Sequence, residues 1–157
     1  MLYYNRSYES AIAAKNKFNL GSSLTGLGNV NEAMGNNELA LSYYKKSIAN
    51  ALEINNTSTI IVTYIALSKL FVKTGNRDSA ILYAKLALNI SRDKQFKRQF
   101  VDAAKQLSDL NEGTNDKEAL RYYKLAMNVK DSIFNAASTA QIQAMTFDEQ
   151  ERQREIN

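Results

Sequence analysis

Residues 24–44 read LTGLGNVNEAMGNNELALSYY and carry the clearest structural pattern of the sequence. Apolar residues recur at spacings of three and four on both sides of Gly35-Asn36, the period of an amphipathic helix. Gly35 has no Cβ and can take the positive φ that ends a helix. Asn36 or Asn37 can then cap the next one. The stretch therefore predicts two antiparallel helices joined by a tight turn.

The same hairpin recurs along the chain. Leu27, Leu67 and Leu107 lie 40 residues apart, and Gly35 and Gly75 keep the same spacing. The third copy lacks one residue near its turn. A single hairpin cannot bury its own apolar face, so the copies must stack. Further positions in step are Ala40 with Ala80 and Ala119, Ile48 with Leu88 and Met127, and Tyr43-Tyr44 with Tyr122-Tyr123.

The motif Leu27-Gly28, followed by Gly35, Ala40 and Tyr44, resembles the tetratricopeptide repeat. The resemblance implies an all-α, right-handed α-solenoid of stacked antiparallel helical hairpins. The chain departs from the family in its 40-residue period, where the family has 34, and in having no proline. We expect helices longer by a turn or more. Another hairpin repeat of similar length, also forming a right-handed solenoid, stays open as the alternative.

The repeats divide the chain into two parts. Residues 1–134 are predicted to form the repeat domain, and residues 135–157 a C-terminal helix that either caps the repeats or connects them to another segment. Within the repeat domain we expect a partial repeat at 1–16 and full repeats at about 20–56, 57–94 and 96–134. Tyr43, Tyr44, Tyr122 and Tyr123 have helical core spacing and are expected to pack between helices.

The amino-acid composition argues against catalysis and metal binding. The chain has no Cys, His or Trp, so thiol nucleophiles, thiolate or imidazole metal sites and histidine bases are excluded. We expect no enzyme activity, no cofactor and no metal. The net charge of +4 comes from scattered basic residues, which does not indicate nucleic-acid binding. The longest apolar run, Ile60 to Leu67, is too short to span a bilayer, which needs about 20 residues. We expect any membrane attachment to come from segments outside this sequence.

The resemblance also implies a binding groove, because first helices of tetratricopeptide repeats line a concave face. The implied positions face away from the leucine stripe and fit an extended peptide or a partner's helix. Val62, Ile65 and Val72 would form an apolar floor flanked by charges. The implied partner-binding residues are Ser22, Thr25, Asn29 and Glu32 in the first copy, Val62, Ile65, Lys69 and Val72 in the second, and Asp102, Lys105, Asp109 and Glu112 in the third.

The end of the chain carries a second resemblance. Lys130-Asp131-Ser132-Ile133-Phe134-Asn135, followed by a Gln- and Glu-rich helix, is similar to the exit from the repeats in membrane-bound sensor proteins of Bacteroidetes-type bacteria, which lead to a histidine kinase or another output domain. It implies a non-catalytic sensor segment of a signalling protein that binds a protein or peptide partner, on the periplasmic side. A homodimer through the C-terminal helix is also open. The alternatives are a free-standing adaptor, including a cytoplasmic one, and an accessory domain of an enzyme that lies outside these residues.

Overall fold

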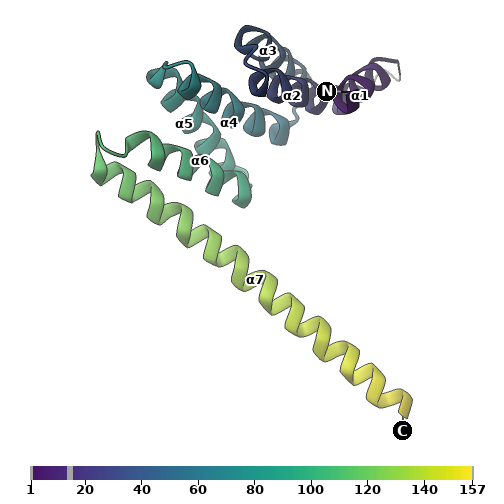
Figure 1. Cartoon of the computed structure of the whole chain (residues 1–157). Coiled ribbons are helices and arrows are strands. Elements are labelled where there is room, and N and C mark those ends of the chain that lie inside the picture. Colours follow the sequence, from purple (N-terminus) through teal and green to yellow (C-terminus); the bar gives the residue numbers. More distant parts are fainter. Residues whose placement is uncertain (1, 14–15, 157) are drawn as a thin grey trace.

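The computed structural model describes residues 2–13 and 16–156, so positions 1, 14 and 15 of the expected partial repeat and position 157 of the expected C-terminal helix lie outside it. In these residues the chain is all helix and turn, without a strand, and consecutive helices pack side by side as stacked hairpins (Figure 1). The predicted all-α, tetratricopeptide-like solenoid is confirmed. The helices are α1 Leu2–Ala13, α2 Lys17–Ala33, α3 Asn37–Glu53, α4 Thr57–Lys73, α5 Arg77–Asp93, α6 Lys97–Asn111 and α7 Asp116–Ile156.

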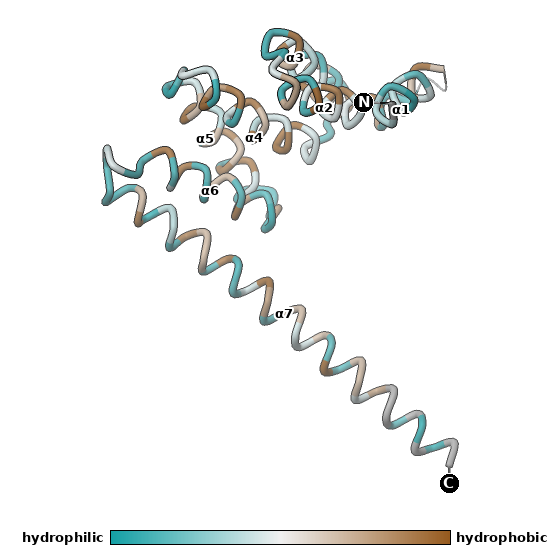
Figure 2. Tube along the Cα trace, in the orientation of Figure 1, coloured by the Kyte–Doolittle hydropathy of each residue, from teal (hydrophilic) through white to brown (hydrophobic). Residues whose placement is uncertain are grey.

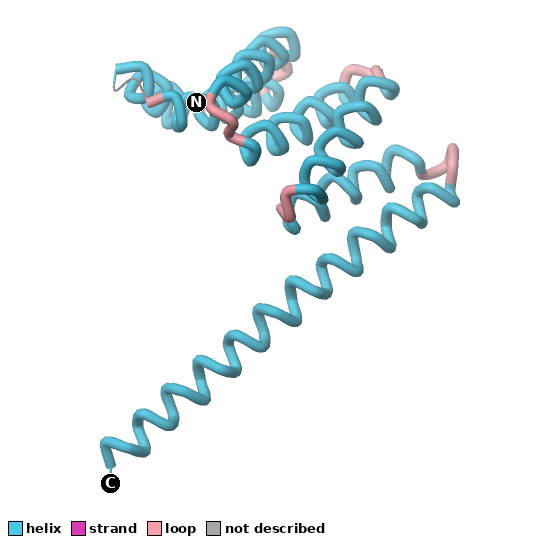
Figure 3. Tube along the Cα trace, turned by 180° about the vertical axis from the view of Figure 1, so that it is seen from behind, coloured by secondary structure: helices cyan, strands magenta, loops and turns pink. Residues whose placement is uncertain are grey.

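The 40-residue period arises from long helices and short turns. Helices α2 to α5 each have 17 residues, and three residues separate each from the next. Figure 3 shows these connections as short loops between the helices. Asn16, Asn56 and Asn76 occupy N-caps, where each side chain accepts a hydrogen bond from a backbone N–H of the first turn. Gly35 and Gly75 have φ of 84° and 77°, as the sequence predicted for the helix stops. Each repeat therefore adds about a turn to each helix of the usual unit.

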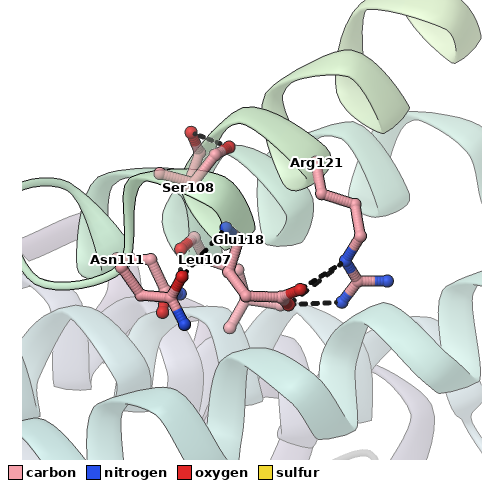
Figure 4. Close-up of polar contacts among 7 residues, drawn as sticks. Leu107, Ser108, Asn111, Glu118 and Arg121 are labelled. Atoms are coloured by element: carbon pink, nitrogen blue, oxygen red, sulfur yellow. Dashed lines mark hydrogen bonds and ion pairs between the residues drawn. The ribbon is translucent and has the colours of Figure 1, made fainter.

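The third hairpin keeps the same polar contacts despite its missing residue. The hydroxyl of Ser108 on α6 donates to the carbonyl of Ala119 on α7 at 2.9 Å (Figure 4). Its counterpart Ser68 donates to the carbonyl of Ala80 at 2.8 Å. Glu118 receives two hydrogen bonds from Nε of Arg121 and one from its Nη2, on the exposed surface of the first turns of α7. Serine at this position therefore ties the two helices of a hairpin together.

The repeating leucines and alanines form the core, as their spacing predicts. Leu27, Leu67 and Leu107 are exposed by at most 1%. Ala40 and Ala80 are completely buried, which lets the helices of each hairpin approach closely. A core cluster around α4, α5, α6 and α7 is separate from a smaller one that joins α3 to α4. Consecutive hairpins thus share their apolar surfaces, as a solenoid requires.

One tyrosine lies outside the core that its spacing predicts. Tyr44 is fully buried and Tyr122 is 5% exposed, but Tyr123, the counterpart of Tyr44, is 51% exposed. The ring of Tyr44 lies over Gly28, where a Cβ would stand 2.3 Å from the ring. At the counterpart of Gly28 the third repeat has Ser108, and no further helix of the described residues covers this side of α7. The pocket that holds Tyr44 is formed by a glycine and a following helix, and Tyr123 has neither.

Helix α7 passes the expected boundary at residues 134 and 135 without a break. It forms the second helix of the last hairpin and then continues in the same direction, away from the stack (Figure 1). The segment between Lys130 and Asn135 contains no glycine or proline that would end a helix. The C-terminal segment is therefore a direct extension of the last repeat.

Candidate functional site: the inner-face groove

Three adjoining hollows run along the face formed by the first helices of the repeats, α2, α4 and α6. The first, about 210 Å³, and the second, about 550 Å³, share Asn29 and Val62. The second and the third, about 410 Å³, share Lys69. We call this continuous surface the inner-face groove. The second and third hollows each have a volume in the range of known ligand sites.

The middle hollow combines an apolar floor with charges of both signs. Its apolar part includes Val62, which is 40% exposed, and Ala66. Around this floor lie Glu32 and Asp102 as potential anions and Lys69 and Arg98 as cations, from three different helices. Such a surface can hold one apolar side chain of a ligand while polar groups on both sides fix its position.

A buried tyrosine holds two groove residues in place. The Tyr44 hydroxyl lies 2.8 Å from Oδ1 of Asn29 and 2.7 Å from Oε2 of Glu32, so its single proton is shared between these two acceptors. Nζ of Lys73 donates to the backbone carbonyl of Glu32 at 2.5 Å. Burial, reinforced by the Glu32 carboxylate, raises the pKa of Tyr44 well above its ordinary value of 10.0. The polar wall of the groove is thus preorganised by the core of the first repeat.

The structure places two of the predicted groove residues inside the molecule. Thr25 is 5% exposed, and its hydroxyl lies 2.8 Å from the hydroxyls of both Ser47 and Thr63. Ile65 is 8% exposed and belongs to the main core cluster. Both touch the edge of a hollow, but their main contacts are with neighbouring helices. Both residues face the interface between successive repeats, where α2 packs against α4 and α4 against α6.

The other predicted positions lie on or beside the groove. Two of them line no hollow: Lys105 is exposed on α6, and Glu112 ends that helix in the following turn. The sequence prediction did not include Arg98, Gln99 or Arg77, which do line it. Arg98 and Gln99 lie one turn before Asp102, so extending the same helical face by a turn would have found them. The predicted residues that line it are Ser22, Asn29, Glu32, Val62, Lys69, Val72, Asp102 and Asp109.

In the described part of the chain, no group of three or more acidic side chains is gathered as a metal ion would require. The same residues contain no helix that is both long and apolar enough to cross a membrane. What the groove offers is hydrogen bonds, charge and apolar surface, which are the means of recognition.

Stacked hairpins with a groove along their first helices define a helical-repeat scaffold for binding. The comparison with protein families names the repeat: the model of the tetratricopeptide repeat matches residues 19–93, which cover the first two full hairpins. This match supports a tetratricopeptide repeat domain, a fold that generally mediates protein–protein interaction and is typically non-catalytic. No curated protein matches the chain.

Proposed function

We propose that the chain binds an extended segment or a helix of a partner protein in the inner-face groove. The observation that carries the proposal is the continuity of the three hollows across α2, α4 and α6, with Val62 and Lys69 each shared by two of them. A ligand that follows the groove would meet all three repeats. The groove favours a segment with an apolar side chain flanked by charges of both signs.

Replacing Val62 by serine together with Lys69 by glutamate should weaken binding of a groove ligand at least about tenfold, a loss of roughly 1.4 kcal/mol. Both side chains are exposed, so helicity and the melting temperature should stay close to those of the wild type. The probe is a peptide selected on the wild-type chain from a phage-displayed random library. Its dissociation constant is measured by calorimetry.

The matched control is Leu82→Ser with Lys85→Glu on α5. Leu82 is 55% exposed, Lys85 is also exposed, and neither lines the groove. This variant should bind the peptide like the wild type. If both double variants weakened peptide binding equally, or if neither weakened it, the selected peptide would bind outside the groove.

We further propose that the chain is the sensor segment of a membrane-bound signalling protein on the periplasmic side. The similarity of residues 130–135 to the exit segment of such sensors supports this assignment, and so does the course of α7, which leaves the stack as a single uninterrupted helix. A ligand on the groove would bias the position of α6, against which α7 packs. The exit helix would carry that change onward.

The sequence encoded after Asn157 in the source genome tests this finer proposal. We expect an apolar span of about 20 residues followed by an output domain. A stop codon directly after Asn157 would contradict it and would favour the free-standing adaptor, while leaving peptide binding in the groove untouched.

A further inference from the structure

The part of α7 that extends beyond the stack has an unusual surface. Helices α3 and α5 end at Glu53 and Asp93, positions that the repeat aligns with residue 132. Helix α7 continues for 24 more residues, about 36 Å. We call residues 133–156 the overhang. Most helical stability in proteins comes from the packing of an apolar face, and α7 contacts no described helix other than α6, so the overhang calls for a partner.

The composition of the overhang indicates that it is covered. Residues 132–147 contain no charged side chain, although 23% of the whole chain is charged. Apolar positions recur along this part of α7, where no other helix lies beside it (Figure 2). Phe134, Ile142, Met145 and Phe147 are 60 to 69% exposed. A stretch of helix that lacks charge and exposes several large apolar side chains marks an interaction site.

The exposed residues contain a helix-pairing seam. Phe134, Ala137, Gln141 and Ala144 are separated by three, four and three residues, the a and d positions of a heptad repeat. The positions beside the seam are also largely apolar, with Ala140, Met145 and Phe147. Ile142 lies away from it. The seam is thus wider than a stripe of small residues and has one polar position, Gln141.

We propose that the overhang pairs in parallel and in register with the overhang of a second copy of this chain. Gln141 is the reason for choosing a second copy as the partner and a parallel arrangement of the two helices. An amide carries both donors and an acceptor, so the two copies of Gln141 can hydrogen-bond to each other across a two-fold axis. An antiparallel pair would place each Gln141 against the methyl group of Ala137. A single polar residue at an a position is a known determinant of register.

Sedimentation equilibrium of the purified chain over a wide range of concentrations tests the pairing. We expect a dimer with twice the mass of the 17.6 kDa chain. Phe134→Glu should raise its dissociation constant at least about tenfold, because a charge enters the seam. Ile142→Glu is the matched control, since Ile142 is 64% exposed against 69% for Phe134 and lies off the seam. A monomer at all concentrations would overturn the proposal, and so would a dimer that both variants preserve.

Disulfide formation tests the direction, because the chain has no cysteine of its own. Ala144→Cys should form an intermolecular disulfide under mild oxidation, since the in-register pair places the two residues face to face. In an antiparallel pair centred on the seam they would lie about 15 Å apart, too far for a disulfide. Cross-linking of Ile142→Cys but not of Ala144→Cys would overturn the register. The pairing does not depend on the groove, so either proposal can fail alone.

Discussion

Replacing Leu107 by alanine should lower the free energy of unfolding by about 2–5 kcal/mol, the range for truncating a fully buried leucine. Leu107 has no exposed surface and belongs to the main core cluster. The truncation leaves a cavity in the hairpin of α6 and α7 that rigid neighbouring helices cannot fill. Urea unfolding followed by circular dichroism measures the loss.

Leu82→Ala is the control for the leucine stripe. Leu82 is 55% exposed on α5, so its truncation should change the free energy of unfolding by no more than about 0.5 kcal/mol. If Leu107→Ala and Leu82→Ala had equal effects, the repeat register that assigns Leu27, Leu67 and Leu107 to the core would be wrong.

The second large effect is a loss of stability at alkaline pH. Because folding raises the pKa of Tyr44, the folded state keeps the phenol proton after the unfolded state has released it. The stabilising contribution is therefore fully present below about pH 10 and declines as the pH rises further. For this one group the slope is about 1.4 kcal/mol per pH unit. The free energy of unfolding, measured in urea at a series of alkaline pH values, shows this decline.

Tyr44→Phe removes the titrating group and should flatten the alkaline part of the curve. It should also cost about 1 kcal/mol at neutral pH, since the hydroxyl loses its hydrogen bonds to Asn29 and Glu32. Tyr123→Phe changes a half-exposed residue at the same repeat position and should leave the wild-type curve unchanged. If the free energy of unfolding of Tyr44→Phe fell at alkaline pH as steeply as that of the wild type, a group other than Tyr44 would cause the decline.

Much of the fold was predictable because its signals are local and periodic. Gly35 and Gly75 mark turns by their backbone freedom, and the leucine stripe marks the core by its helical spacing. The same regularity sets the period of 40 residues. Each repeat restates the pattern, so three copies support a single interpretation.

The prediction was wrong where burial depends on the neighbouring repeat. Tyr44 and Tyr123 occupy the same repeat position, but only Tyr44 has both a following helix and a glycine, Gly28, beneath its ring. Thr25 and Ile65 line the edges of the hollows, but close packing between first helices leaves them only 5% and 8% exposed. A periodic pattern shows which face of a helix is apolar, but not where that face changes from the groove to the interface between repeats beside it.

The sequence predicted which helices form the groove, but not every residue that lines it. Val62 and Lys69 line the hollows as the family resemblance implies, while Arg98 and Gln99 emerged only from the structure. These two residues lie near the start of α6, beyond the stretch from which the register was first taken.

Amide NMR with the selected peptide shows whether a partner binds along α2, α4 and α6. Titration of the isotope-labelled chain should shift the signals of residues around Asn29, Val62, Lys69 and Asp102, which line the middle hollow. Signals from the exposed side of α5, including Leu82 and Lys85, should stay in place. Shifts confined to that side, or to the overhang of α7, would show that the peptide does not bind in the inner-face groove.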